Sequence, residues 1–471
     1  MVVQSKLWST ASCYELGHTW TPTCKKASLD LAKASYSYSL RLYAIFYIVS
    51  SLVKVKGRIK KIKWRKYVRD VVQSTLFLGS NAILFLSSFC LFRRMFGGFN
   101  LSFAFLCGIP SCFFAISIER KERRGVLALY VANLAAEILF NMAVCRGYIK
   151  PIKYGEVLIF SITTALALYM LRVGDILQRD AQSTLKSLFG PCELPSHLQE
   201  PTLTGEVATQ DSNSIFSRIY QFLPREAQQF LTVITKRVEE LPRHRLCKHQ
   251  FSCLHYFSEG FLSRFCLGYA IQTAFNLFRS IPKAIQKPSS IAWSLIDKNN
   301  FYLGFFMGGL AGFFRIIMCL LRWIRNKDSP FHALLAGFLS GLSSFAYRSN
   351  AITLYFASRI AENLFFFGQR KGFIPPVPVG DRILYTLSTS TILHASVFEP
   401  HTIRPAYWKF LLRLTGNYFA LMNRKIIDVL GTQASKLYPD FWPKYDLRYV
   451  SPQLQTEELY NWWFTNIFQK L

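Results

Sequence analysis

The stretch Leu129-Tyr-Val-Ala-Asn-Leu-Ala-Ala-Glu137-Ile-Leu-Phe140 recurs without a gap as Leu354-Tyr-Phe-Ala-Ser-Arg-Ile-Ala-Glu362-Asn-Leu-Phe365. The same offset relates Gly147 to Gly372. Shorter matches follow in the same order, with Ser37–Ile45 on Ser263–Ile271, and Ala104, Gly108 and Ser111 on Ala333, Gly337 and Ser340. Each copy of the long stretch carries a glutamate inside an apolar run. The sequence therefore predicts a duplicated membrane bundle with an acid at the same depth in each half.

The apolar residues gather in long runs, and 51% of the 471 residues are hydrophobic. A helix needs roughly 17–25 residues to cross a membrane, and lipid admits helices because their backbone groups bond to one another. The predicted class is all-α, a polytopic membrane protein of two repeated bundles with four to five helices each. We expect helices at Val71–Phe92, Phe99–Ile118, Val126–Val144, Val157–Leu171, Phe301–Leu321, Ala333–Ala346, Ala351–Phe367 and Ile383–Phe398, with weaker candidates at Tyr36–Val53 and Phe257–Phe278.

The formal net charge of +29 has two readings. In a soluble protein it would indicate nucleic-acid binding, whereas in a membrane protein Lys and Arg collect in loops that stay cytoplasmic. The densest basic run, Lys54–Arg69, also contains Trp64 and Tyr67, a combination that suits an anionic headgroup layer. We therefore favour a membrane surface and expect no nucleic-acid partner.

The number of spans in each half decides the topology. Five spans would make the halves inverted, and four would make them parallel. Loop charge favours four, because this arrangement puts the N-terminal region, Lys54–Arg69, Glu119–Arg124, the connector and the tail on one side. The positive-inside rule makes that side the cytosol.

Changes in composition divide the chain into five segments. The polar connector contains a stretch rich in Pro, Thr, Gln and Ser at Ser196–Ser214 and an amphipathic pattern at Ile215–Leu241. We expect the basic, aromatic tail to be partly helical and to lie on the membrane surface. The segments are an N-terminal Cys/His region (1–35), a first membrane repeat (36–179), the connector (180–250), a second membrane repeat (251–398) and the tail (399–471).

Charged residues inside apolar runs are the first candidate site. Arg359 precedes Glu362 by one helical turn, so the two can pair on one face. Glu137 lacks an equivalent partner, and Arg315 is a candidate for it. A buried structural pair and a polar cavity for an ion, a proton or a lipid headgroup are both open readings of Glu137, Arg315, Arg359 and Glu362.

Glycines at a spacing of four lie on single helix faces. One set is Gly304, Gly308 and Gly312, and the next predicted helix carries Gly337 and Gly341. Such glycines let helix backbones approach closely, and we favour this packing role over a ligand-lining face.

One Cys/His cluster precedes the first helix of each half. The first is Cys13, His18 and Cys24, and the second contains Cys247, His249 and Cys253. Cys and His together can hold zinc, but the spacing does not match a standard zinc finger and no Cys-x2-Cys is present. We therefore expect thiols or a disulfide here, and neither a metal nor another cofactor.

Common enzyme signatures are absent from the sequence. We find no His-Glu-x2-His, no Gly-x-Ser-x-Gly, no phosphate loop ending in Gly-Lys and no Gly-x-Gly-x2-Gly. We expect a protein that is not an enzyme.

Long motifs throughout the chain carry a family resemblance. They are Cys13-Tyr-Glu-Leu-Gly-His-Thr-Trp20, Ile118-Glu-Arg-Lys-Glu-Arg-Arg-Gly125, Gly155-Glu-Val-Leu158, Pro242-Arg-His-Arg245, Leu321-Arg-Trp-Ile-Arg-Asn326, His332-Ala-Leu-Leu-Ala-Gly-Phe-Leu339, Tyr407-Trp-Lys-Phe-Leu-Leu-Arg-Leu-Thr415, Met422-Asn-Arg-Lys425 and Gly431-Thr432. The chain resembles the transmembrane protein 135 family, also called peroxisomal membrane protein 52. Its glycine-rich helices are more distantly similar to the four-helix translocase family of the inner mitochondrial membrane.

The resemblance implies a multi-pass protein of the peroxisomal membrane, with the mitochondrial membrane as a second location. It implies roles in fatty-acid and lipid homeostasis, mitochondrial fission and organelle dynamics, and it supplies no catalytic residue. The partners it suggests are membrane lipids, a fatty acid or sterol, and organelle-dynamics proteins. Two mechanisms stay open: a lipid or metabolite conduit built on the repeats, and a scaffold that recruits fission or tethering factors.

Overall fold

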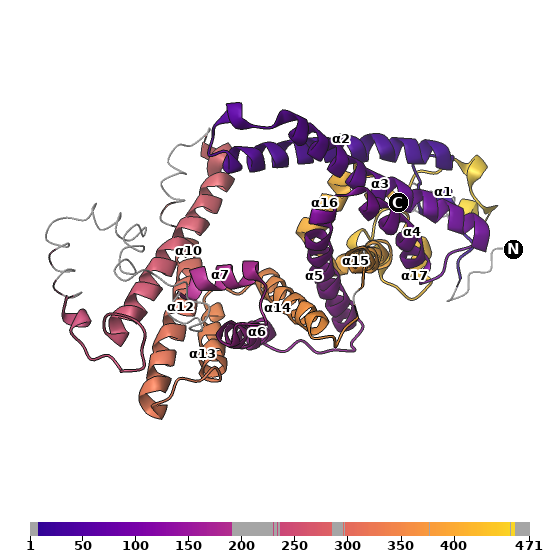
Figure 1. Cartoon of the computed structure of the whole chain (residues 1–471). Helices are drawn as coiled ribbons and strands as arrows, with labels where there is room; N and C mark the ends of the chain where they lie inside the picture. Colours follow the sequence, from indigo (N-terminus) through magenta and orange to yellow (C-terminus); the bar gives the residue numbers. More distant parts are fainter. Residues whose placement is uncertain are drawn as a thin grey trace. The chain divides into compact units, whose positions relative to one another are not determined.

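The protein is all-α, as its sequence predicts (Figure 1). The computed structural model describes residues 8–190, 236–284, 297–375 and 377–456 except Gln453, together with Gln229, Val233 and Leu295. In this part of the chain the regular structure is helical, apart from an isolated bridge between Ser9 and Phe99. The predicted connector stretch Ser196–Ser214 lies outside the described residues, as does most of the predicted amphipathic helix Ile215–Leu241.

All ten predicted apolar segments are helices. Four of them, within the described residues, are long and apolar enough to cross a membrane, so a polytopic membrane protein is confirmed. These four are α3 (Trp64–Phe96), α5 (Lys121–Cys145), α6 (Gly155–Val173) and α12 (Lys298–Arg325). The others are the shorter apolar α4 (Phe103–Ile118) and α13 (His332–Gly341, continued by η4, Leu342–Phe345), and α2 (Cys24–Lys54), α10 (Cys253–Ala284), α14 (Asn350–Arg370) and α15 (Gly380–Phe398).

Local chemistry explains where the long helices begin and end. The carboxylate of Asp297 accepts a hydrogen bond from the backbone N–H of Asn299 and so caps the start of α12. Gly97 ends α3 with φ of 74°, and Asn326 ends α12 with φ of 52°, two residue types that tolerate the left-handed region. These residues set the length of each long helix.

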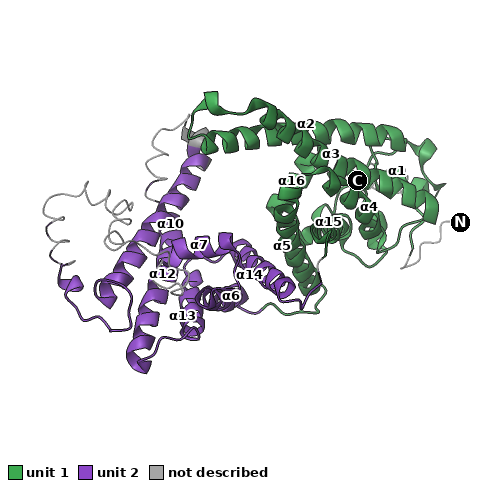
Figure 2. Cartoon of the chain, viewed as in Figure 1, with its two compact units in different colours: residues 1–151, 377–471 green, residues 152–376 purple. Residues whose placement is uncertain are grey.

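The helices form two compact units that cut across the predicted segments (Figure 2). Unit 1 contains residues 1–151 and 377–471, and unit 2 contains residues 152–376. Helix α6, from the predicted first repeat, packs against α13 and α14 in unit 2. Helix α15, from the predicted second repeat, packs against α4 and α5 in unit 1. Helix α6 of the predicted first repeat thus belongs to unit 2, and helix α15 of the predicted second repeat belongs to unit 1.

Small residues make these two exchanged contacts possible. A Cβ placed on Gly108 of α4 would lie 2.9 Å from the Cα of Ser390 on α15. On Gly337 of α13 it would lie 2.7 Å from the Cα of Ala165 on α6. Real Cβ atoms do not approach a neighbouring backbone this closely, so glycine is required at both positions.

The other predicted glycines also lie at helix contacts. Gly304, Gly308 and Gly312 of α12 face α10, and a Cβ on Gly308 would lie 2.8 Å from the carbonyl oxygen of Phe261. A Cβ on Gly341 would lie 2.5 Å from the Cα of Ser161 on α6. Backbones therefore pack closely along both α10–α12 and α6–α13.

The antiparallel pair α2 and α3 decides one point of topology. Cys24, the first residue of α2, and Cys90, near the end of α3, belong to one cluster of side chains, whereas the run Lys54–Arg69 joins the opposite ends of these helices. If α3 crosses a membrane, the N-terminal region and Lys54–Arg69 lie on opposite sides of it. The four-span arrangement puts these two segments on the same side, whereas the α2–α3 hairpin puts them at opposite ends of α3; the number of spans in each half stays a prediction.

The tail also differs from expectation, because its described part packs into unit 1 instead of lying on a membrane surface. It contributes α16 (Pro405–Leu414), α17 (Lys425–Asp428) and several short 3-10 turns. Ile427 is fully buried in the same core as Leu16. The backbone N–H of Asn423 donates to the carbonyl of Leu16, with 3.1 Å between the two atoms, and the hydroxyl of Tyr445 donates to the carbonyl of Glu15. Burial of these apolar side chains holds the tail against the N-terminal region.

Replacing Gly341 with alanine tests the close contact between α13 and α6. The added methyl group meets backbone that cannot move aside, so the free energy of unfolding should fall by about 1–3 kcal/mol. Gly125→Ala is the matched control, because a Cβ at Gly125 meets nothing within 4 Å. Thermal unfolding of the detergent-solubilised protein should show a lower melting temperature for Gly341→Ala only; equal melting temperatures would contradict the contact.

Candidate functional site

Glu137 has a partner that the sequence did not reveal. On α5 of unit 1, its carboxylate binds the guanidinium of Arg404, which directly precedes α16. Only 12% of the Glu137 side chain is exposed. The partner suggested by the sequence was Arg315, but the structure pairs Glu137 with Arg404 and Arg315 with Glu259. The acid is neutralised by a residue far along the chain, which lowers the cost of holding it inside an apolar bundle.

Arg315 is held in the centre of unit 2 by three other groups. Its Nε donates to the carbonyl of Phe189 and its Nη1 to the carbonyl of Tyr256, each at 3.1 Å. Nη1 also lies 3.6 Å from a carboxylate oxygen of Glu259. A Cβ on Gly260 would lie 2.6 Å from the Cδ of Arg315, so this glycine makes room for the side chain. The guanidinium thus fixes α12 against α10 and the end of α7 (Arg179–Phe189).

The third charged pair is the one that helix spacing predicts. Arg359 donates to Glu362 across one turn of α14. The pair is partly exposed, at 30% and 18% for the two side chains. The four candidate residues therefore form three separate charged pairs, Glu137 with Arg404, Arg315 with Glu259, and Arg359 with Glu362.

A fourth charged group, around Asp328, was missed because its members look like loop and helix-end charges. Asp328 follows α12, and its Oδ1 accepts from Arg172 of α6 at 2.6 Å and from Arg322 of α12 at 3.2 Å. Arg322 is 1% exposed. Burial alone would raise the pKa of Asp328, but the hydrogen bond from Arg172 and the charges of both arginines lower it below its ordinary value. This carboxylate links α6 to α12 by charge.

Unit 2 also contains a pocket of about 550 Å³ with an apolar lining. The volume lies within the range of about 300–1,000 Å³ that small-molecule sites occupy. Its walls come from α6, α7, α10, α12, α14 and the segment between η4 and α14, with Gln272, Tyr347 and Tyr355 as the polar residues. Its apolar lining is Phe160, Leu188, Ile271, Phe275, Leu303, Phe306, Met307, Leu310, Ile352 and Phe356. A cavity in unit 1, lined by Phe85, Tyr385 and other residues, is about 90 Å³.

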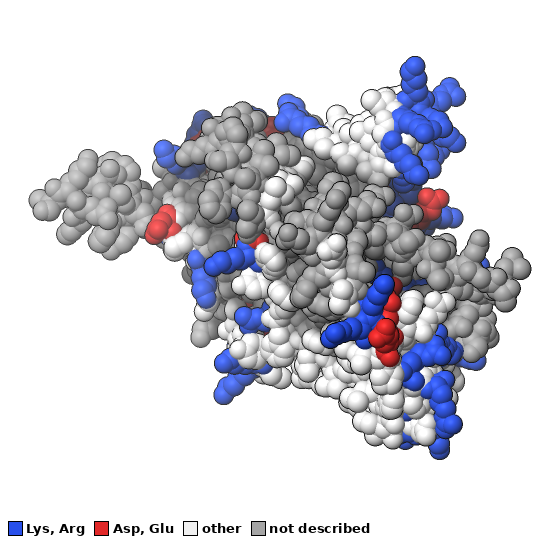
Figure 3. Space-filling view, turned by 90° about the vertical axis from the view of Figure 1, so that its left-hand side faces the viewer, with Lys and Arg blue, Asp and Glu red and all other residues white. Residues whose placement is uncertain are grey.

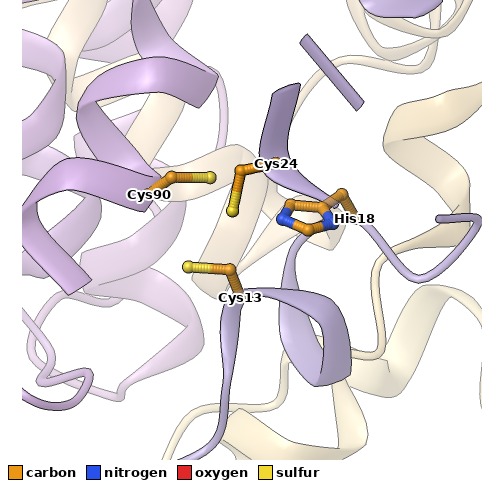
Figure 4. A group of neighbouring side chains, drawn as sticks. All are labelled: Cys13, His18, Cys24 and Cys90. Carbon is orange, nitrogen blue, oxygen red and sulfur yellow. The ribbon is translucent and has the colours of Figure 1, made fainter. Parts of the chain in front are cut away.

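The N-terminal Cys/His residues meet at one point, where the structure adds a fourth member (Figure 4). Cys13, His18 and Cys24 are joined by Cys90 of α3, and their sulfur and ring-nitrogen atoms all lie within 4.8 Å of one another. Figure 4 shows the side chains pointing toward a common centre. We call this set the N-cluster.

The second set also consists of three cysteines and one histidine, and all four residues are buried. Cys247, His249 and Cys253 are joined by Cys319 of α12, again with all ligand atoms within 4.8 Å. The Sγ atom of Cys247 lies 3.9 Å from that of Cys253 and 3.8 Å from that of Cys319, and the Nε2 atom of His249 lies 3.4 Å from the Sγ of Cys319. We call this set the C-cluster.

Both clusters favour a thiolate. A hydrogen bond from Cys90, together with His18, lowers the pKa of Cys13 below its ordinary value. A hydrogen bond from Cys319, together with His249, does the same for Cys247. None of the cysteines in the described part of the chain forms a disulfide bond. Three thiols and an imidazole at such distances are a ligand set for a soft, tetrahedral metal ion.

Comparison with known proteins identifies the region around the N-cluster. Residues 10–144 match the family model of the N-terminal cysteine-rich region of transmembrane protein 135. No solved structure matches the chain. The match confirms the resemblance to the transmembrane protein 135 family, while the distant likeness to the mitochondrial translocase family stays a prediction.

Replacing Asp328 with asparagine tests the charge link between α6 and α12. Loss of the shared carboxylate should lower the free energy of unfolding by about 3 kcal/mol at neutral pH. This value is the lower end of the range for breaking a buried ion pair, because Asp328 is partly exposed. Because its folded pKa is lowered, its stabilisation is complete above the ordinary value of 3.8 and disappears as pH falls through the folded pKa. The difference in melting temperature between wild type and variant should therefore shrink below about pH 4.

The control for this experiment is Asp446→Asn, which removes an exposed ion pair with Arg448. Its melting temperature should equal that of the wild type at every pH, because solvent screens exposed pairs. A difference for Asp328→Asn that stays constant down to pH 3 would contradict the charged link.

Proposed function

Because the chain carries the cysteine-rich region of the transmembrane protein 135 family, we propose that this membrane protein acts in lipid and fatty-acid homeostasis and in regulating mitochondrial fission and organelle dynamics. The proposed location is the peroxisomal membrane, with the mitochondrial membrane as a second one. The observation that carries the proposal is the apolar pocket of unit 2, which suits an acyl chain or a sterol body. The organelle and the cellular roles rest on the family resemblance.

The pocket has the features that a membrane lipid requires. The inner part of the pocket is lined by aromatic and aliphatic side chains, among them the buried Phe306 and Leu310 of α12. Its rim contains Phe275 and Tyr355, whose side chains are 60% and 59% exposed. Burial of a hydrocarbon chain is favourable by roughly 0.8 kcal/mol for each CH₂ group, and Gln272 offers a polar contact for a hydroxyl or carboxylate end.

A conduit mechanism follows from the position of this pocket within a helical bundle. The pocket would hold the lipid tail between helices while polar and charged side chains of the bundle contact the headgroup, and these contacts lower the cost of carrying the headgroup through the apolar layer. Under this mechanism the charged pair of Arg359 and Glu362 on α14, in the same unit as the pocket, lies along the headgroup route. In this proposal the protein moves or exchanges fatty acids or sterols and performs no covalent chemistry.

The exposed basic loop supports the scaffold as a second candidate. Lys60, Lys61, Lys63, Arg65 and Lys66 are exposed, and the apolar side chains of Ile59 and Trp64 beside them are exposed at 60% and 52%. Figure 3 shows Lys and Arg side chains gathered in separate groups with uncharged surface between them. Such a loop can bind an anionic membrane or an acidic partner, with about 1 kcal/mol from each basic residue at a membrane surface.

Filling the pocket tests the lipid proposal. Met307→Trp places a ring in the lining of the pocket, so equilibrium binding of a fluorescent fatty acid or sterol to the purified protein should weaken about tenfold, which corresponds to roughly 1.4 kcal/mol. Transbilayer movement of the same probe in liposomes should fall in parallel. The Glu362→Gln variant should keep the binding and lose the movement, because it alters only the proposed headgroup route.

Tyr302→Trp is the matched control for Met307→Trp. It lies on the same helix, its side chain is 49% exposed, and it does not line the pocket, so binding should be unchanged. Equal binding by wild type and Met307→Trp would show that the pocket does not bind the lipid. Absence of probe movement with folded wild-type protein would favour the scaffold.

Charge reversal in the basic loop tests the scaffold. Lys60, Lys61 and Lys63 are changed together to glutamate, and cosedimentation with vesicles containing anionic lipid is measured at rising salt. The variant, held in nanodiscs without detergent, should bind these vesicles at least about tenfold more weakly than the wild type does. Its binding should also no longer depend on the salt concentration. In cells the variant should lose its organelle location, whereas Glu362→Gln should keep it; the reverse pattern would favour the conduit.

A further inference from the structure

We propose that the chain binds two zinc ions, one in the N-cluster and one in the C-cluster, each in a closed site of three cysteines and one histidine. The proposal departs from the sequence-based expectation of thiols or a disulfide without a metal. It is independent of the lipid proposal, because both clusters lie outside the pocket of unit 2.

The distances in the C-cluster are those of a tetrahedral zinc site. Zinc lies about 2.3 Å from sulfur and about 2.0–2.1 Å from nitrogen, so tetrahedral ligands are about 3.8 Å apart for two sulfurs and about 3.5 Å apart for sulfur and nitrogen. The two Sγ–Sγ distances from Cys247 are 3.9 and 3.8 Å. The Nε2 of His249 lies 3.4 Å from the Sγ of Cys319. These three distances match three edges of the required tetrahedron.

In both clusters the histidine is oriented as a zinc ligand is. The Nδ1 of His18 lies 2.8 Å from the carbonyl oxygen of Thr21, and the Nδ1 of His249 lies 2.7 Å from that of Phe251. Donation from Nδ1 to a carbonyl leaves Nε2 with a lone pair for a metal, the usual second contact of a zinc-bound histidine. His18 is fully buried, and its Nε2 has no hydrogen-bond partner in the described part of the chain. A buried nitrogen of this kind is costly unless it binds something.

The two clusters occupy equivalent places on two helix hairpins. Cys24 is the first residue of α2 and Cys253 is the first residue of α10, while Cys90 and Cys319 lie near the ends of α3 and α12. A single offset relates both of these cysteine pairs, and the same offset relates Gly108 to Gly337. A set of three cysteines and one histidine thus occurs twice, with two of its cysteines at the same hairpin positions, which chance contact between thiols does not explain.

A disulfide explains the clusters less well than zinc does. Sulfur atoms in a disulfide are about 2.05 Å apart, and one bond uses two of three thiols and leaves the imidazole without a role. Four protein ligands also leave no open position for a substrate, so the sites are structural and not catalytic. In each hairpin the ion would tie the segment before the first helix to the far end of the second helix.

Metal analysis of the full-length protein tests the proposal. The chain is purified in detergent under reducing conditions after growth with zinc, and its metal content is measured by mass spectrometry. Wild type should carry about two zinc ions in each chain, and Cys90→Ser and Cys319→Ser should each carry about one. Cys145→Ser should retain both ions, because Cys145 is an exposed cysteine outside the clusters.

A second measurement on wild-type protein covers the case in which a variant fails to fold. Zinc is removed with a chelator and replaced by Co²⁺, which should give the visible bands of tetrahedral cobalt–thiolate centres. Chelation should also make about six thiols newly reactive to a thiol reagent. Metal-free wild type that gives no cobalt bands would overturn the proposal, as would loss of zinc from Cys145→Ser equal to that from Cys90→Ser.

Discussion

The close approach of helix backbones at glycine is the contact on which both units depend. Unit 1 is completed when α15 lies against α4 at Gly108, and unit 2 is completed when α6 lies against α13 at Gly337 and Gly341. Helices in lipid gain little from apolar burial, so packing at such close contacts supplies much of their association energy. The exchange of α6 and α15 makes each unit depend on residues from both halves of the sequence, and the pocket of unit 2 has a wall from α6 for this reason.

Ion pairs and the two Cys/His clusters then fix the ends of these helices. Asp328 holds α6 to α12 through Arg172 and Arg322, and Arg404 holds the region before α16 to α5 through Glu137. The N-cluster and the C-cluster perform a similar task where a polar segment enters a hairpin. Such attachments restrict the sliding and rotation of neighbouring helices, to which uniform apolar surfaces offer little resistance.

Hydropathy predicts the helices of this protein well, because lipid leaves the backbone no other way to satisfy its hydrogen bonds. The Arg359–Glu362 pair follows from helical spacing alone. Contacts between residues far apart in the sequence could not be predicted in this way. Arg404 is far from Glu137 in the sequence. The composition of the tail is that of a surface segment, but Ile427 lies in the same core as Leu16. Cys90 and Cys319 were missed as cluster members because a thiol within an apolar run resembles any small hydrophobic residue.

The exchanged helices have a consequence for biogenesis. During synthesis α6 emerges and inserts long before α13 and α14, its packing partners, have been made. Unit 1 likewise stays incomplete until α15 has been translated. Until then the face of α4 at Gly108 and the face of α6 at Ser161 and Ala165 lack their partners, and incomplete bundles of this kind are prone to association. A chain truncated after the first half would lack α15 and the tail of unit 1 and would leave α6 without its packing partners α13 and α14.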